Sequence, residues 1–174
     1  IIAGLAVGAD NGYIYLREEY SHLRPRLLSA IAQCEAAGYL GEDILGSGLN
    51  YRIHLFSGAG AYVCGEGSAL AESIGGHAGR PRMKPPFIKQ CGVFHLPTCV
   101  NNVESLSLVA PLLLDDEGYY KSQGTPDCPG TKMISVCGNV KRPGVFEVPF
   151  GITIREIVYD LAGGMENEDY PLRL

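Results

Sequence analysis

The residues best suited to chemistry form a glycine-rich segment in the middle of the chain. Residues 57–60 read SGAG, and Gly65 and Gly67 follow shortly after. Glycines between a strand and a helix let the backbone approach a ligand closely, and the helix N-terminus offers free N–H groups and the positive end of a dipole. This arrangement suits a phosphate group or the polarised edge of a planar ring.

A structural tight turn explains the same glycines equally well, because short glycine motifs often occur by chance. Gly58 and Gly60 are not followed by the third glycine of a dinucleotide-binding G-x-G-x-x-G fingerprint. No Gly-Lys-Ser/Thr ending of a phosphate loop is present either. The pattern alone therefore leaves both a ligand-binding loop and a turn open.

The cysteines lack the spacing of a metal cluster. The six are Cys34, Cys64, Cys91, Cys99, Cys128 and Cys137. No Cys-x-x-Cys pair occurs, although zinc and iron–sulfur sites commonly use one. This usage is typical of reduced thiols in a cytosolic protein.

Composition excludes several classes of function. The 174 residues carry a formal net charge of −5 without a Lys/Arg run, whereas nucleic-acid binding needs clustered cations. The best apolar stretch, residues 106–114, is far shorter than the roughly 18–20 residues that span a bilayer. We therefore expect no nucleic-acid partner and no direct membrane insertion. Because the chain begins with Ile1 rather than Met, we also expect it to be a fragment.

Helices and strands alternate around the glycine segment and predict an α/β domain. We expect helices at 1–9, 21–38, 62–73 and 101–114, and strands at 13–17 and 51–56. Residues 75–97 are rich in Gly and Pro and predict an irregular but ordered loop. Pro111 should shorten or kink the last helix.

The pattern changes after Asp115 and predicts a second domain. We expect strands at 132–138 and 145–150, a turn at 139–144 and a helix at 153–162. A hairpin followed by a helix is the opening of a ubiquitin-like β-grasp unit. The predicted organisation is a first domain at 1–118, a linker at 119–130 and a truncated β-grasp unit at 131–174.

Three motifs, in this order and spacing, resemble one protein family. Gly58–Glu66 reads GAGAYVCGE, Arg80–Phe87 reads RPRMKPPF and Pro97–Leu106 reads PTCVNNVESL. They are similar to signatures of the NADH-binding flavoprotein subunit of NADH:quinone oxidoreductase and of related subunits in NAD-linked hydrogenases and formate dehydrogenases. The resemblance implies part of a Rossmann-like FMN- and NADH-binding domain, followed by a β-grasp unit of the SLBB type.

The resemblance also implies a function and a set of contacts. NADH would give a hydride to FMN, and single electrons would then pass to iron–sulfur clusters, with the cofactor rather than a side chain carrying the chemistry. The implied flavin contacts are Tyr62, Gly65, Glu66, Val100, Asn101, Asn102 and Ser105, with Gly58 and Gly60 in the cofactor loop. Lys84 and Phe87 resemble the NADH contacts of the family. Their alternative roles are a solvated cation beside a Pro-Pro turn and a core anchor.

Gly67 stands where the family usually has a second glutamate that faces the nucleotide. An acidic group near the adenosine ribose favours NAD over NADP. Our hypothesis is that Gly67 weakens this preference, or nucleotide binding itself. Ser57 likewise replaces an arginine before the glycine loop, and Ile88-Lys89 replaces the more usual Pro-Ala.

Other parts of the family's site are expected outside this chain. An upstream glycine-rich loop and an acidic segment should precede Ile1, and the cysteine ligands of a [4Fe–4S] cluster should follow Leu174. The resemblance implies partner subunits in a redox complex, including a small [2Fe–2S] thioredoxin-like subunit. It implies a location in the cytoplasm, or peripherally on the cytoplasmic face of the inner membrane. A non-catalytic ligand-binding adaptor and a degenerate assembly scaffold stay open as alternatives.

Overall fold

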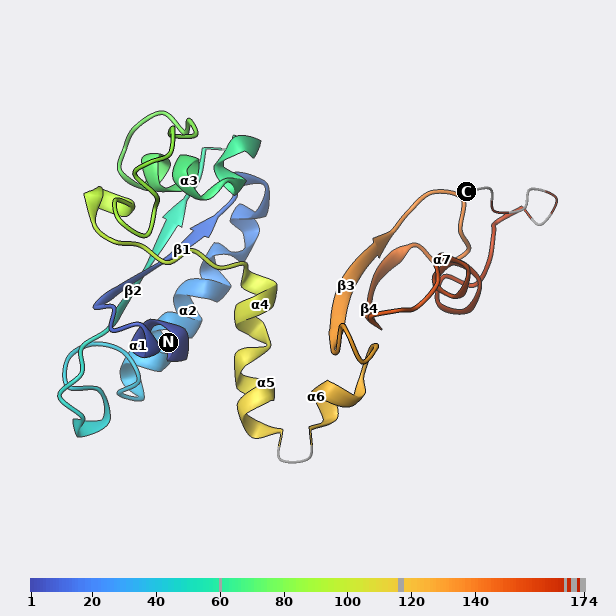
Figure 1. The fold of residues 1–174 in the computed structure, drawn as a ribbon, viewed down its shortest axis with the longest axis horizontal. Coiled ribbons are helices and arrows are strands. Elements are labelled where there is room, and N and C mark those ends of the chain that lie inside the picture. The colour runs from blue at the N-terminus through green and yellow to red at the C-terminus, as the bar shows by residue number, and fades with distance from the viewer. Residues whose placement is uncertain (60, 116–117, 168, 170–171, 173–174) are drawn as a thin grey trace. The chain divides into compact units, whose positions relative to one another are not determined.

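The computed structural model describes residues 1–59, 61–115, 118–167, 169 and 172, and the chain forms two compact units, Ile1–Asn102 and Val103–Leu174 (Figure 1). The first unit contains α1 (Ile2–Ala6), β1 (Asn11–Leu16), α2 (Arg24–Ala36), β2 (Arg52–Ser57) and α3 (Gly67–Ile74). The second contains α4 (Val103–Ser107), α5 (Val109–Leu114), α6 (Tyr119–Ser122), β3 (Thr131–Val136), β4 (Gly144–Pro149) and α7 (Ile154–Glu156). The predicted mixed α/β class is confirmed, while the predicted domain boundary at 118 stays a prediction.

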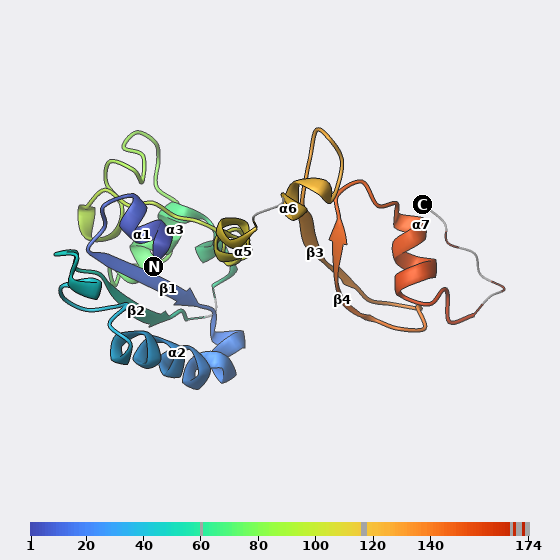
Figure 2. The same cartoon turned by 90° about the horizontal axis from the view of Figure 1, so that it is seen from below.

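Strands β1 and β2 form a parallel pair, from Asn11 opposite Arg52 to Leu16 opposite Ser57. Parallel neighbours need a long crossover connection, and α2 supplies it here. Helices α2 and α3 lie on opposite sides of the pair (Figure 2). Because successive side chains of a strand point to opposite faces, each helix packs on its own set of strand residues.

Each side of the strand pair has its own apolar core. On one side Leu40, Ile44 and Tyr51 are buried against residues that include Ile31 of α2 and Ile53 of β2. The other side buries Ala71, Ile74 and Val93, with Tyr15 and Phe56 packed against them. Val93 comes from the predicted irregular loop, so this loop is anchored in the core beside α3.

The helix predicted over 62–73 is wrong at its start. Tyr62–Gly65 forms a 3₁₀ turn, and α3 begins only at Gly67. Glu66 between them has extended backbone angles (φ −80°, ψ 133°), and its side chain caps α3. A capping carboxylate that accepts backbone N–H groups ends one helical segment and begins the next.

Two other predicted helices are also divided. The helix expected from residue 21 starts with a 3₁₀ segment, Glu18–Leu23, and becomes α-helical at Arg24. The helix expected over 101–114 stops at Ser107 and resumes at Val109. Pro111 has no N–H to donate to the carbonyl of Ser107, four residues earlier, so the break predicted for this proline is confirmed.

The second unit has the predicted hairpin and helix. β3 and β4 pair in antiparallel register, from Thr131 opposite Pro149 to Val136 opposite Gly144. Helix α7 opens with a capping box between Thr153 and Glu156 and continues as a π-helical segment, Ile157–Leu161. Its apolar face joins a core of Val140, Val158 and Ala162.

None of the helices in the described part of the chain is long and apolar enough to cross a membrane.

Gly12→Ala tests how tightly Tyr51 is held. A Cβ at Gly12 would lie 2.2 Å from the Tyr51 hydroxyl, and one at Gly4 would lie 2.3 Å from Cζ of the same ring. Since the buried ring is enclosed by both glycines, we expect Gly12→Ala to lower the free energy of unfolding by about 1–3 kcal/mol in a denaturant titration of the full-length protein. Gly144→Ala is the control, because its Cβ would meet only ring atoms of Phe146 at 3.7 Å or more. Equal stabilities would contradict the packing argument, and adding Tyr51→Phe to Gly12→Ala should recover part of the loss.

Candidate functional site

A hollow of about 620 Å³ opens beyond the carboxyl ends of β1 and β2. Its lining residues are Tyr15, Arg17, Ala61, Tyr62, Val63, Cys64, Gly65, Glu66 and Leu70. The two strand ends are joined here by a hydrogen bond of 2.8 Å, donated by the N–H of Gly58 to the carbonyl of Leu16. Small-molecule sites commonly have volumes of about 300–1,000 Å³, and in open parallel sheets they lie at this edge.

The hollow combines an exposed ring, a cation and open backbone. The Tyr62 side chain is 87% exposed, and the Arg17 guanidinium lies 6.0 Å from its ring centre. A Cβ added at Gly65 would meet nothing within 4 Å. A planar ligand therefore finds a ring face and unobstructed space here, beside a guanidinium that is also paired with Glu19 at 2.5 Å.

The predicted glycine loop is held in place by packing. A Cβ at Gly58 would lie 2.5 Å from the Tyr15 hydroxyl, and that hydroxyl shares a 3.0 Å hydrogen bond with Ser73 of α3. Gly58 therefore has a structural reason to be glycine, independent of any ligand. Gly60 lies outside the described residues.

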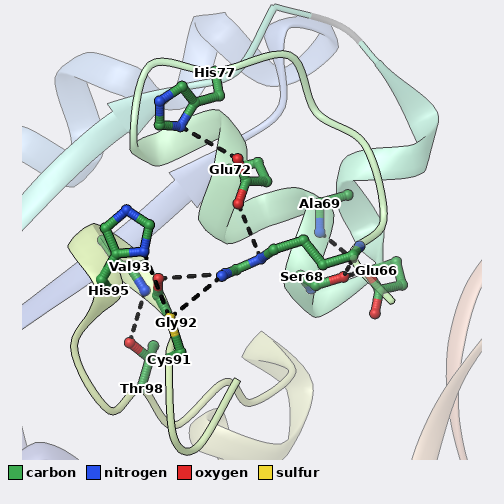
Figure 3. Close-up of polar contacts among 11 residues, drawn as sticks. Glu66, Ser68, Ala69, Glu72, His77, Cys91, Gly92, Val93, His95 and Thr98 are labelled. Carbon is green, nitrogen blue, oxygen red and sulfur yellow. Dashed lines mark hydrogen bonds and ion pairs between the residues drawn. The ribbon is translucent and has the colours of Figure 1, made fainter. Parts of the chain in front are cut away.

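Glu66 caps α3 with one oxygen of its carboxylate (Figure 3). Its Oε2 accepts hydrogen bonds from the N–H of Ser68 at 2.8 Å and of Ala69 at 2.9 Å. The Ser68 hydroxyl, the Ala69 amide and the nearby Lys84 hold the pKa of Glu66 at about 2, below its ordinary value of 4.5. The expectation of free N–H groups at this helix N-terminus is wrong for Ser68 and Ala69, because the carboxylate already accepts from both.

The loop with the predicted nucleotide contacts is fastened to the same end of α3. The N–H of Arg82 donates to the Ser68 hydroxyl at 2.9 Å, and Lys84 Nζ lies 3.4 Å from Glu66 Oε1. Two of the predicted contacts, Lys84 and Glu66, are therefore brought together, although 18 residues separate them.

Phe87 does not anchor the core. Its side chain is 46% exposed, and the Lys89 ammonium lies 5.9 Å from the ring centre. The exposed ring can stack on a planar partner.

Gly67 is the first residue of α3 and has room for a side chain. A Cβ there would meet only Ile88 Cδ1, at an ordinary contact distance of 3.5 Å. Packing would therefore allow a glutamate at this position.

The remaining predicted contacts do not line the hollow. Val100, Asn101 and Asn102 lie outside helices and strands at the end of the first unit. Val100 is 41% exposed, and the Asn101 amide donates to Cys99 Sγ at 3.3 Å. Ser105 lies in α4 and belongs to the second unit.

Sequence reasoning missed two arginines beside the glycine loop. Arg17 follows β1 directly and lines the hollow, and Arg24 Nη1 donates to the Ser57 hydroxyl at 2.8 Å. A guanidinium from α2 therefore lies beside Ser57, the position at which the resemblance leads us to expect an arginine. Parallel pairing of the two predicted strands would have placed Arg17 at the same edge as the loop.

Among the residues that the structure describes, no group of three or more His, Cys, Asp or Glu side chains is arranged to hold a metal ion.

Parallel strands with helices on both sides and a hollow beyond their carboxyl ends are features of the α/β ligand-binding class. The model of the Nuo51 FMN-binding domain family matches residues 1–111, and that of the SLBB domain matches residues 133–171. The chain belongs to the Nuo51 FMN-binding domain family, and its FMN-binding domain is followed by an SLBB domain. The resemblance predicted from the three motifs is confirmed.

Individual relatives agree with this assignment. An F subunit of the NADH-quinone oxidoreductase of Rhizobium meliloti is 42% identical over 163 residues, which cover 94% of this chain and 39% of the relative. The F subunit of the same enzyme in Salmonella typhimurium is 44% identical over 167 residues, covering 96% and 38%. A chain of the NAD⁺-reducing [NiFe]-hydrogenase in its H₂-reduced state superposes with a TM-score of 0.86 and 38% identity, covering 97% of this chain and 28% of that one. This chain thus spans less than half the length of these relatives.

The Glu66 cap predicts a pH-dependent contribution to stability. Because folding lowers the pKa of this carboxyl to about 2 from 4.5, its contribution is complete above pH 4.5 and is lost as the pH falls from 4.5 towards 2. We expect Glu66→Gln to lower the free energy of unfolding by about 1 kcal/mol at pH 7 and by progressively less below pH 4.5, in denaturant titrations of the full-length protein. The control, Glu35→Gln, removes an exposed carboxylate from α2. The free energy of unfolding of this variant should change with pH in the same way as that of the wild type. A wild-type to Glu66→Gln difference that stays constant down to pH 3 would refute this role.

Proposed function

We propose that this chain carries part of the FMN- and NADH-binding site of an electron-input subunit. In this function NADH gives a hydride to FMN, and the electrons leave singly to the iron–sulfur clusters of a larger redox complex. The observation that carries the proposal is the hollow beyond β1 and β2, lined by the motif residues 61–66, in a chain that belongs to an FMN-binding family.

The residues present fit a flavin. Bound FMN would supply the exchange between two-electron and one-electron chemistry. Tyr62 offers an exposed ring face, and Gly65 leaves space for close approach of its backbone. Arg17 supplies a positive charge in the same hollow, which suits a phosphate oxygen or negative charge on a reduced ring.

Lys84 and Phe87 are proposed to hold the nucleotide. The Lys84 side chain is 48% exposed, and its ammonium lies 3.4 Å from Glu66 Oε1, so it can reach a phosphate or ribose oxygen without leaving its partner. The half-exposed Phe87 ring suits stacking on adenine. Both residues project from a loop that the Arg82–Ser68 hydrogen bond fixes to α3.

The roles of Val100, Asn101, Asn102 and Ser105 as flavin contacts rest on the resemblance alone. Asn side chains can donate and accept hydrogen bonds at the polar ring edge or at ribityl oxygens. The proposal extends to partner subunits, among them a small [2Fe–2S] subunit, and to a [4Fe–4S] cluster held by residues outside this chain. It places the complex in the cytoplasm or on the cytoplasmic face of the inner membrane.

Lys84→Met tests the proposed nucleotide contact. Loss of the ammonium should raise the KM for NADH about tenfold, which corresponds to one charged contact of about 1.4 kcal/mol. The flavin content should be unchanged. The measurements are NADH:ferricyanide reduction and FMN released by acid, both on the full-length protein, with the α6 substitution Lys121→Met as control.

Two outcomes would refute the proposal at different points. Full-length protein without FMN and without NADH:ferricyanide activity would favour the adaptor or scaffold instead. If the protein is active but the Lys84→Met and Lys121→Met variants have the same KM for NADH, Lys84 is not part of the nucleotide site.

Gly67→Glu tests the nucleotide preference. A carboxylate near the ribose repels a 2′-phosphate, so we expect the ratio of kcat/KM for NADH to that for NADPH to rise about tenfold. Gly67→Gln has nearly the same size without the charge and should leave the ratio close to that of the wild type. An unchanged ratio in Gly67→Glu would show that this position does not face the nucleotide.

A further inference from the structure

A second cluster of reactive side chains lies within the Gly/Pro-rich loop. Cys91 Sγ lies 3.5 Å from His95 Nδ1, and Arg82 Nη1 donates to the same sulfur at 3.7 Å. Figure 3 shows Cys91 and His95 close together on this loop. A thiol beside an imidazole and a guanidinium has both a proton acceptor and a positive charge for its anion.

The guanidinium has two further contacts, and its partner Glu72 is in turn held by His77. Arg82 Nε lies 2.9 Å from Glu72 Oε1, and Nη2 donates to the Gly92 carbonyl at 3.3 Å. The other oxygen of Glu72, Oε2, lies 3.2 Å from His77 Nδ1. The charge beside Cys91 is therefore fixed by the fold and does not depend on a freely moving side chain.

The loop backbone turns His95 back towards Cys91. Phe94 and His95 both have positive φ, at 51° and 64°, a conformation that residues other than glycine adopt rarely. The N–H of Val93 donates to Thr98 Oγ1 at 3.0 Å, and Val93 itself is buried. The hydrogen bond and the burial of Val93 hold this tight turn in place, while His95 stays exposed.

The other thiols have different surroundings. Across the described residues, Cys91 is the cysteine whose sulfur is in hydrogen-bond contact with both an arginine and a histidine. Cys64 is buried, whereas Cys99 is exposed and accepts only from the neutral Asn101 amide. Cys91 is partly exposed, so a small oxidant can reach it.

We propose that Cys91 is a peroxide-reactive thiol, with His95 as its proton acceptor and Arg82 as a hydrogen-bond donor to its sulfur. His95 Nδ1 accepts the thiol proton, and the sulfur attacks one oxygen of a hydroperoxide. The S–O bond forms as the O–O bond breaks, so sulfur is oxidised by two electrons and the peroxide is reduced. The leaving oxygen takes the proton from His95, and the products are a cysteine sulfenic acid and water or an alcohol.

The test is site-resolved labelling of the full-length protein. Hydrogen peroxide is added with dimedone, which traps sulfenic acids, and chymotryptic cleavage after Phe94 separates Cys91 from Cys99 for mass spectrometry. We expect Cys91 to be labelled at least about tenfold faster than the more exposed Cys99. Equal or slower labelling of Cys91 overturns the proposal.

Two histidine variants separate activation from simple exposure. His95→Asn removes the proton acceptor but keeps a residue that tolerates positive φ, and it should slow Cys91 labelling about tenfold. His77→Asn changes the other histidine of the cluster, which contacts Glu72 and not the sulfur, and should leave the rate unchanged. Melting temperatures of both variants show whether the fold is retained. An unchanged rate in folded His95→Asn, or an equal loss in both folded variants, overturns the role assigned to His95.

Discussion

One carboxylate oxygen, Glu66 Oε2, accepts the first free amides of α3 and so decides where that helix begins. Because the helix starts only at Gly67, the preceding residues are free to form the tight turn that lines the hollow beyond β1 and β2. The same end of α3 then receives the Gly/Pro-rich loop, through the Arg82–Ser68 hydrogen bond and the Lys84–Glu66 ion pair. The hollow and the loop are thus positioned by one set of contacts.

Arg82 connects the two chemically distinct parts of this loop. Its backbone N–H is fixed to α3 near the Lys84 side, while its guanidinium lies between Glu72 and Cys91. Arg82 therefore contacts the thiol with its side chain and fastens the proposed nucleotide-binding segment to α3 with its backbone.

The glycines of the first unit serve two purposes that composition does not distinguish. Gly12 and Gly58 are required because the rings of Tyr51 and Tyr15 occupy the space of a side chain. Gly65 and Gly67 have open space or an ordinary contact instead, so any requirement for glycine there must come from a ligand or from function. Gly12 and Gly58 let the tyrosine rings pack against the backbone. Gly65 and Gly67 lie at the edge where the cofactor is proposed to bind.

The order of strands and helices, the break before Pro111, the hairpin of the second unit and the family could all be predicted from the amino-acid sequence. These depend on local patterns: alternation, a missing N–H, and contiguous motifs. Three features became visible only in the folded chain: Glu66 caps α3, Arg17 lines the hollow and Arg82 contacts Cys91. These features depend on which distant segment supplies a charge or a hydrogen-bond donor. Local periodicity does not show which residues parallel strand pairing, or the packing of a loop on a helix, will bring together.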